Sequence, residues 1–186
     1  TESGLQYVLV GGYAVSAFNT RFSTDLDIVV LPEARDEFVD FLEERGFEET
    51  GSHAKQWVYD TEVVEYEKRL APRQPIGFDL LVNGLGCRQT EAQWSFDYLD
   101  SHSSRTEISG GTAKTTARTV DGALLVAAKL HSGRETDIRD VLAVAEGINL
   151  DAVTPHLHRG DETALREQLE RGLRILEGDE LRHGFR

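Results

Sequence analysis

Two glycines and two aspartates constrain this chain more than any other feature of its sequence. Gly11 and Gly12 follow the apolar run 6–10, and Asp25 and Asp27 stand about a dozen residues later. A short apolar run that ends at glycine is typical of a buried strand. The segment 6–10 is therefore predicted to be a strand that ends at the diglycine.

The two aspartates open a second predicted strand, over residues 25–30. Side chains alternate between the faces of a strand, so Asp25 and Asp27 are expected to point the same way. Both carboxyl groups ionise with a usual pKa of about 3.9, and the two charges then repel each other. A cation between them removes this penalty, and proteins usually hold Mg²⁺ with one or two carboxylates plus substrate phosphates. The pattern indicates a divalent metal site, with an exposed acidic strand face as the alternative.

The diglycine adds a second part to the same candidate site. A strand that ends at Gly11 and Gly12 and leads into a helix, expected over 13–18, presents backbone N–H groups at the positive end of the helix dipole, where phosphate binds. Glycine also allows a ligand to approach the backbone closely. A phosphate cradle beside paired carboxylates is the equipment for phosphoryl or nucleotidyl transfer, although a diglycine alone more often indicates a turn.

The remaining pattern predicts mixed α/β structure followed by helices. Before residue 120 the expected elements are a helix at 33–45, a hairpin at 56–59 and 63–66, a strand at 77–82, a helix at 92–99, and strands at 105–108 and 113–118. After it, helices are expected at 121–131, 135–146, 151–158 and 161–176. We predict an α/β fold with a small mixed sheet flanked by helices and a C-terminal helical part, divided into residues 1–119 and 120–186 around a shared core.

Charge narrows the classes of function. The 186 residues include 33 Asp and Glu against 20 Lys and Arg, which gives a formal net charge of −13. Such a surface repels nucleic-acid phosphate on average, but a local basic site could still bind a nucleotide because salt screens the distant charges. An acidic excess with few lysines also resembles the composition of proteins adapted to high salt.

Other features exclude further classes. No stretch approaches the roughly 20 apolar residues of a membrane span, so no membrane partner is expected. Cys87 is the single cysteine and cannot form an internal disulfide, which favours a cytoplasmic location. The sequence has no Met, so we expect the natural chain to begin before Thr1.

The order of the motifs resembles the DNA polymerase β-like nucleotidyltransferases, in which a glycine pair after a strand precedes Asp-x-Asp. The stretch Arg21-Phe-Ser-Thr-Asp-Leu-Asp27 resembles the AbiEii-type subgroup, which includes toxins of toxin–antitoxin systems. Segments 124–134 and 137–140 resemble the helical Lys…Arg…Asp segment of that subgroup, with Lys129 as its lysine. The family also uses a third carboxylate on a later strand, which the resemblance places at Asp79.

The resemblance implies an enzyme that moves an NMP from an NTP to an acceptor hydroxyl and releases pyrophosphate. The catalytic residues, which would also hold Mg²⁺ in a two-ion site, are Asp25, Asp27 and Asp79. The nucleotide-binding residues would be Gly11, Gly12, Ser23 and Lys129. The acceptor would be tRNA if the protein is a toxin with an antitoxin partner.

Several alternatives stay open. The protein could modify a small molecule or another protein, or could be a non-catalytic member that binds nucleotides or a partner, although the three intact aspartates argue against the last. The acidic charge disfavours a polynucleotide unless arginines gather beside the cleft. Individual residues also have structural alternatives: Ser23 could be a turn hydroxyl, Lys129 could extend to solvent, and Asp137 and Asp140 could pair with Arg134 or Arg139.

Overall fold

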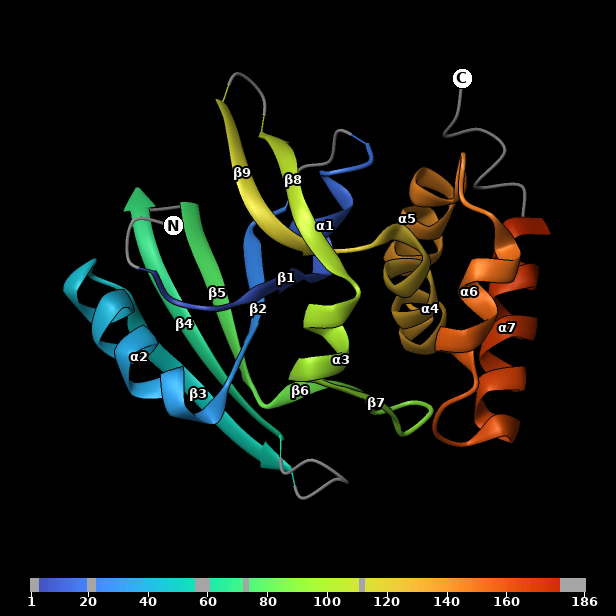
Figure 1. The fold of residues 1–186 in the computed structure, drawn as a ribbon, viewed down its shortest axis with the longest axis horizontal. Helices are drawn as coiled ribbons and strands as arrows, with labels where there is room; N and C mark the ends of the chain where they lie inside the picture. Colours follow the sequence, from blue (N-terminus) through green and yellow to red (C-terminus); the bar gives the residue numbers. More distant parts are fainter. Residues whose placement is uncertain (1–3, 20–22, 56–60, 72–73, 111–112, 178–186) are drawn as a thin grey trace. The chain divides into compact units, whose positions relative to one another are not determined.

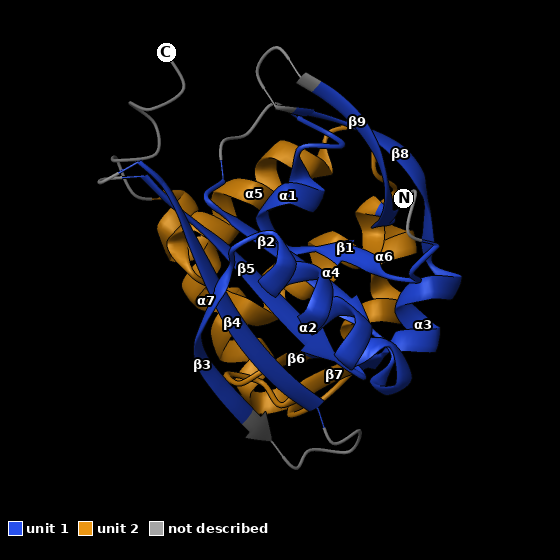
Figure 2. Ribbon diagram, turned by 90° about the vertical axis from the view of Figure 1, so that its left-hand side faces the viewer, with its two compact units in different colours: residues 1–85, 94–121 blue, residues 86–93, 122–186 orange. Residues whose placement is uncertain are grey.

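The computed structural model describes residues 4–19, 23–55, 61–71, 74–110 and 113–177. The chain forms two compact units, which Figure 2 distinguishes by colour. Unit 1 comprises Thr1–Leu85 and Trp94–Asp121, and unit 2 comprises Gly86–Gln93 and Gly122–Arg186. Each unit has its own secondary structure and its own buried residues.

A mixed seven-stranded sheet forms the centre of unit 1, in the order β3-β4-β5-β2-β1-β9-β8 (Figure 1). Its strands are β1 (Val8–Val10), β2 (Asp25–Val30), β3 (Glu48–Lys55), β4 (Thr61–Ala71), β5 (Gln74–Val82), β8 (Ser103–Gly110) and β9 (Ala113–Val120). The pairs β2–β5 and β1–β9 are parallel and the others are antiparallel. The helical elements of unit 1 are α1 (Gly11–Val15), η1 (Pro32–Ala34), α2 (Arg35–Glu44) and α3 (Phe96–Ser101).

Helix α2 covers one face of this sheet. Phe38 and Leu42 of α2 are buried, at 5% and 1% exposure, as their spacing of four residues on one face of a helix allows. At the N-terminal end of α2, Arg35 donates to Glu62 on β4, with its Nε 2.8 Å from Glu62 Oε2. This hydrogen bond lowers the pKa of the Glu62 carboxyl group. The face that α2 covers therefore carries Glu62, Val64 and Tyr66. The β4 side chains between these residues point to the opposite face.

Unit 2 is helical around α4 (Gly122–Ser132). Helix α4 packs against each of the other three helices, which are α5 (Glu135–Ala145), α6 (Leu150–Leu157) and α7 (Glu162–Glu177). Its consecutive residues Leu124, Leu125, Val126 and Ala127 are all buried, as expected of a helix surrounded on several sides. No helix in the described ranges combines the length and the apolar character that crossing a membrane requires.

The link between β6 (Gly84–Cys87) and β7 (Ala92–Ser95), two strands that pair with each other, is fixed to unit 2 by hydrogen bonds. Thr90 Oγ1 lies 2.7 Å from His131 Nδ1 on α4, and His131 Nε2 lies 3.0 Å from the Leu157 carbonyl oxygen. Burial lowers the pKa of His131, so the neutral imidazole is favoured. A neutral ring that donates from Nε2 and accepts at Nδ1 satisfies both contacts.

The predicted fold class is confirmed, and the differences are local. The prediction of a helix over 92–99 was wrong in its first half, because Ala92–Ser95 forms β7 and the helix begins at Phe96. The Ser95 side chain caps α3 by accepting a hydrogen bond from the Tyr98 N–H, which fixes that boundary. The predicted strand 56–59 lies outside the described residues, and β3 was not predicted, since Glu48–Lys55 has no apolar alternation.

Candidate functional site

The three predicted catalytic aspartates lie on one face of the sheet. On the parallel pair β2–β5, Asp27 is in register with Asp79, and Asp25 is in register with Gly77. Side chains at partner positions of neighbouring strands point to the same face, and the strands are about 4.8 Å apart. The register therefore brings the carboxyl groups of Asp25, Asp27 and Asp79 together on the face opposite α2.

Two glutamates on β4 extend this acidic face. The antiparallel register of β4 and β5 places Glu65 opposite Asp79 and Glu67 opposite Gly77. Sequence reasoning missed both glutamates, because their position depends on how two long strands pair. The available signal was the alternation of acidic residues, Glu65 and Glu67, at the end of a predicted strand. The sequence of one strand does not show which strand pairs with it, so the signal did not place them beside Asp79.

Glycines make room for the two motif aspartates. A Cβ atom on Gly11 would lie 1.9 Å from Asp27 Oδ2, and one on Gly77 would lie 2.4 Å from Asp25 Oδ1. Gly11 also has a φ of +64°, a conformation that favours glycine. Gly11 of the diglycine is thus in direct contact with Asp27, and Gly77 with Asp25.

The N-terminus of α1 faces the same corner without a capping side chain. Its N-cap residue is Val10, which has no polar side-chain atom, and no acidic residue lies in the first turn. The first N–H groups of a helix have no partner within the helix and are typically satisfied by caps, water or a ligand. Gly11 and the buried Gly12 thus form the start of this helix, and their binding of phosphate stays a prediction.

The charged groups that raise the pKa of Asp79 are acidic. Burial raises the pKa of Asp79, and the negative charges of Glu65 and Asp25 raise it further. His53 Nε2 lies 3.9 Å from Glu65 Oε1, and Arg69 pairs with Glu67 at 3.1 Å. A cation bound near Asp79 would reduce the repulsion between its carboxylate and those of Glu65 and Asp25.

The carboxylates on this face have the chemistry of a divalent-ion site. Carboxylate oxygens are the ligands that Mg²⁺ prefers, and one or two of them suffice when substrate phosphates and water complete the shell. Asp27 and Asp79, in register on adjacent strands, provide that number. Within the described ranges no group of three or more His, Cys, Asp and Glu side chains is already placed to hold a metal ion.

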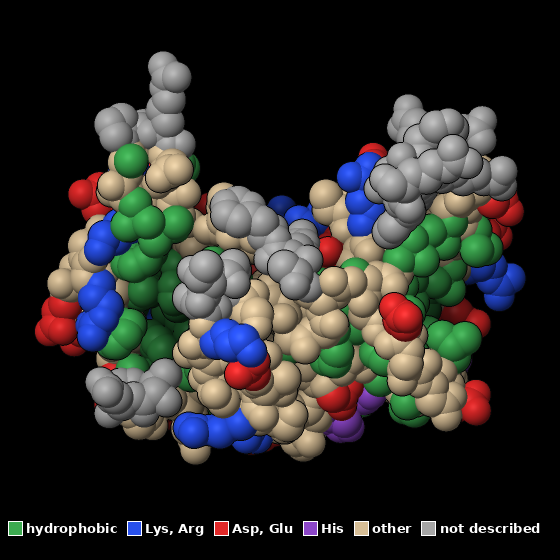
Figure 3. Space-filling view, turned by 90° about the horizontal axis from the view of Figure 1, so that it is seen from above, with side chains coloured by type: hydrophobic (Ala, Val, Ile, Leu, Met, Phe, Trp, Pro, Cys, Tyr) green, Lys and Arg blue, Asp and Glu red, His purple; other side chains and the backbone are tan. Residues whose placement is uncertain are grey.

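A hollow of about 720 Å³ opens beside these carboxylates, within unit 1. Its acidic lining consists of Asp25, Glu65, Glu67 and Asp79, and its less polar lining of Tyr13, Leu70, Pro75 and Ile76. None of the described residues that line it is Lys, Arg or His. Figure 3 shows hydrophobic side chains around a hollow at the left of the view. Strands β4 and β5 lie on the same side in Figure 1.

Ser23 and Arg21 have different outcomes. Ser23 lines the same hollow, and its hydroxyl donates to the Asp25 carbonyl oxygen at 3.1 Å. The hydroxyl thus has the local turn role that was the alternative to nucleotide binding. Arg21, which belongs to the motif that resembles the AbiEii-type subgroup, lies outside the described residues.

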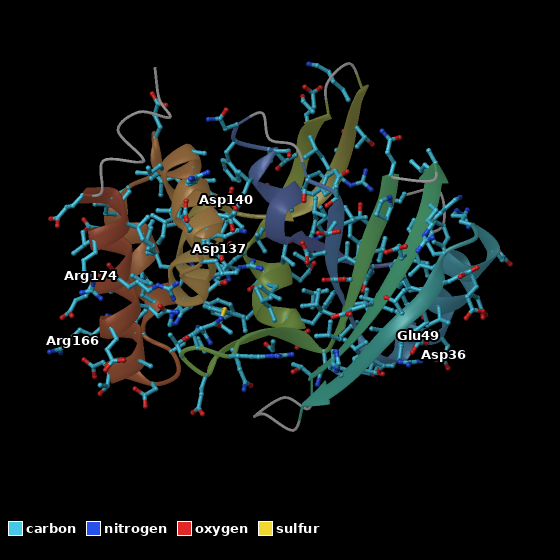
Figure 4. The ribbon with its side chains drawn as sticks, turned by 180° about the vertical axis from the view of Figure 1, so that it is seen from behind. Asp36, Glu49, Asp137, Asp140, Arg166 and Arg174 are labelled. Carbon is cyan, nitrogen blue, oxygen red and sulfur yellow. The ribbon has the colours of Figure 1, made fainter. Side chains whose placement is uncertain are left out.

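Lys129 belongs to unit 2 and is part of a buried charge network with Asp137 and Asp140, the two aspartates labelled in Figure 4. Its Nζ lies 2.7 Å from Asp137 Oδ1 and 2.8 Å from Asp140 Oδ2, and all three residues are buried. Arg134 Nε donates to Asp137 Oδ2 at 2.7 Å, so the expected pairing of Arg134 with Asp137 is confirmed. Burial alone would raise the pKa of Asp137, but Arg134, Lys129 and Ser132 together hold it at about 2. Two cations here balance two carboxylates.

Comparisons with known proteins agree on the fold. No protein-family model matches the sequence, and no curated protein matches it. The structure is similar to the solution structure of the antibiotic-resistance factor ANT(2'')-Ia, with a TM-score of 0.56 and 14% identity over 91% of this chain and 86% of that one. It is equally similar to a crystal structure of ANT(2'')-Ia in complex with adenylyl-2''-tobramycin, with a TM-score of 0.56 and 13% identity over 90% and 91% of the two chains. The chain therefore shares the fold of ANT(2'')-Ia over most of its length.

Proposed function

We propose that this protein is a metal-dependent nucleotidyltransferase that moves an NMP from an NTP to an acceptor hydroxyl and releases pyrophosphate. The observation that carries the proposal is the register of Asp25, Asp27 and Asp79 on one sheet face beside the diglycine corner. The fold shared with ANT(2'')-Ia, solved with an adenylylated antibiotic, supports the same reaction class.

The mechanism assigns separate tasks to the residues of this corner. Asp25, Asp27 and Asp79 would hold Mg²⁺, in one or two sites, and the ion would neutralise phosphate charge and activate the attacking hydroxyl. Gly11 and Gly12 would donate backbone N–H groups to the phosphates. Asp79 also lines the hollow, so it is positioned to accept the proton of the acceptor hydroxyl.

We propose a small hydroxylated molecule with positive charge as the acceptor. Four acidic residues line the hollow beside the catalytic corner, and a volume of about 720 Å³ is of the size that holds a small ligand. Arginines beside the cleft would have favoured a polynucleotide, but Arg105 and Arg118 line a different hollow, and Arg69 pairs with the acidic Glu67. The antibiotic in the ANT(2'')-Ia complex supports an acceptor of this size.

A toxin that modifies tRNA is the second candidate. It is supported by the resemblance of the stretch from Arg21 to Asp27 and of the segment around Lys129 to the AbiEii-type subgroup. Lys129 is charge-balanced within unit 2, so this proposal leaves triphosphate contact to the diglycine. The two candidates differ in where a transferred nucleotide is found and in whether an antitoxin protein binds.

The test follows labelled nucleotide. The protein is incubated with Mg²⁺ and each of the four α-labelled NTPs, first alone, then with tobramycin and related cationic hydroxylated compounds, and then with total tRNA. We expect label on a small molecule. Asp27→Asn should reduce transfer by about a hundredfold or more, because electrostatic stabilisation of the transferring phosphoryl group is lost. Asp40→Asn, an exposed aspartate on α2, is the matched control and should retain activity.

The possible results separate the proposals. Label on tRNA, together with growth arrest that Asp27→Asn abolishes, would support the toxin and overturn the small-molecule acceptor. Unchanged transfer in both Asp25→Asn and Asp27→Asn would overturn the mechanism. Absence of both transfer and pyrophosphate release with every NTP and acceptor would overturn the enzymatic function.

A further inference from the structure

A second hollow of about 340 Å³ lies in unit 1, and its lining differs in charge from the first. The side chains that line it and carry polar groups are Gln6, Tyr7, Asp100, Arg105, Thr116 and Arg118. It shares no lining residue with the acidic hollow. The segment that contributes Gln6 and Tyr7 precedes β1, whereas the diglycine follows β1, so the two sites use opposite ends of that strand.

Two arginines face each other in this second hollow. In the antiparallel register of β8 and β9, Arg105 is the direct partner of Arg118. Side chains at such positions have Cβ atoms about 4.5–5.5 Å apart, and like charges placed there destabilise the pair. An anion bound between the two arginines would reduce this repulsion.

The protein supplies one anion for the two charges. Arg118 donates through Nε to the Asp100 carboxylate and through Nη2 to the Asp100 carbonyl oxygen, the latter at 2.9 Å. These two bonds hold the Arg118 guanidinium in place at the C-terminal end of α3. Asp100 is the single acidic residue among those that line the hollow.

Arg105 is left with positive charge that the described neighbours do not balance. Glu107, two residues along the same strand and on the same face, is paired with Lys114 at 2.7 Å. No hydrogen bond or ion pair joins the exposed Arg105 side chain to an acidic residue in the described ranges. In a chain with a net charge of −13, this hollow is lined by two arginines and one aspartate, and a local positive charge of this kind attracts anions.

We propose that this hollow binds a small molecule through a phosphate group. A guanidinium presents a fork of N–H donors that matches two oxygens of a phosphate, and Arg118 is already oriented by Asp100. Gln6, Tyr7 and Thr116 offer neutral donors for the remaining oxygens. The site is separate from the nucleotide site of the proposed reaction and does not depend on that reaction.

Binding of inorganic phosphate and of glycerol 3-phosphate tests the site and distinguishes free phosphate from a phosphate ester. The full chain is titrated with each compound by calorimetry and by amide NMR, without NTP or divalent ion and at constant ionic strength. Arg105→Gln should weaken binding about tenfold or more, equivalent to about 1.4 kcal/mol. The matched control Arg69→Gln, which removes an exposed arginine from β4, and Asp27→Asn, at the catalytic corner, should bind as the wild type does.

A second variant gives a change in the opposite direction. Asp100→Asn keeps the side-chain oxygen and the backbone carbonyl that orient Arg118 but removes the negative charge that competes with phosphate, so it should tighten phosphate binding, whereas a merely structural pair would give no gain. The proposal is overturned if Arg105→Gln binds phosphate as the wild type does, if acetate at equal ionic strength competes equally well, or if the wild type shows no saturable binding. Amide shifts at the diglycine rather than at Tyr7 and Thr116 would also overturn it.

Discussion

The acidic sheet face of unit 1 and the α4–α5 network of unit 2 both bring carboxylates together, but they treat the charge in opposite ways. In unit 2, Asp137 and Asp140 are buried against Lys129, and Arg134 also binds Asp137. In unit 1, the charged groups that act on Asp79 are themselves acidic. A carboxylate cluster balanced by its own chain stabilises a fold, whereas an unbalanced one is suited to a ligand.

The pKa values of Asp79 in unit 1 and Asp137 in unit 2 shift in opposite directions. The cations around Asp137 hold its pKa at about 2, despite burial that acts in the other direction. Burial and acidic neighbours raise the pKa of Asp79. Ionisation of Asp137 thus stabilises its unit, while ionisation of Asp79 costs stability until a cation binds.

Removal of Lys129 should have the largest effect on stability. Lys129→Ala leaves Asp137 and Asp140 buried with fewer positive charges, and breaking a buried pair in this way costs about 3–5 kcal/mol. Urea unfolding measures the loss, and hydrogen exchange should show it in α4 and α5. The matched control is Lys114→Ala, which breaks an exposed ion pair with Glu107 and should change stability little. Equal losses in the two variants would show that the buried network is not stabilising.

Acid should weaken unit 2 over a defined range of pH. Because the folded-state pKa of Asp137 is depressed to about 2, its contribution is fully present above the unfolded value of about 3.9 and is lost as the pH falls through 2. The loss amounts to about 2 kcal/mol, measured as the free energy of unfolding against pH. Asp137→Asn should lower stability at neutral pH and flatten the profile over that range. A profile unchanged by the substitution would contradict the assignment.

The comparison also shows what the sequence could predict. The shared face of Asp25 and Asp27 follows from alternation along one strand. Asp79 was proposed through the family resemblance, on the strand predicted over 77–82. The register between β4 and β5 decides that Glu65 and Glu67 lie beside the aspartates, and the register between β2 and β5 that Gly77 leaves space for Asp25. Local sequence patterns do not determine these registers.

In unit 2 the helices were predictable from their apolar periodicity, yet the environment of Lys129 was not. Its helix, its buried neighbours and the acidic residues of the next helix are all visible in the sequence. Whether a lysine on such a helix reaches solvent, substrate or a carboxylate depends on how α4 and α5 pack, which is a tertiary property. The packing gives Lys129 two carboxylate partners.

Asp79→Asn should have the smallest effect and the opposite sign. With EDTA present, loss of a carboxylate whose folded-state pKa is raised relieves repulsion from Glu65 and Asp25 above that pKa, so the variant should be more stable than wild type by less than about 1 kcal/mol. With Mg²⁺ and a non-hydrolysable NTP the order should reverse, because only the wild type retains all the proposed ligands and gains from binding. Thermal unfolding under both conditions measures the effect, with Asp40→Asn as control. A variant less stable than wild type in EDTA would mean that the acidic face is balanced without a ligand, and the contrast between the two units would then fail.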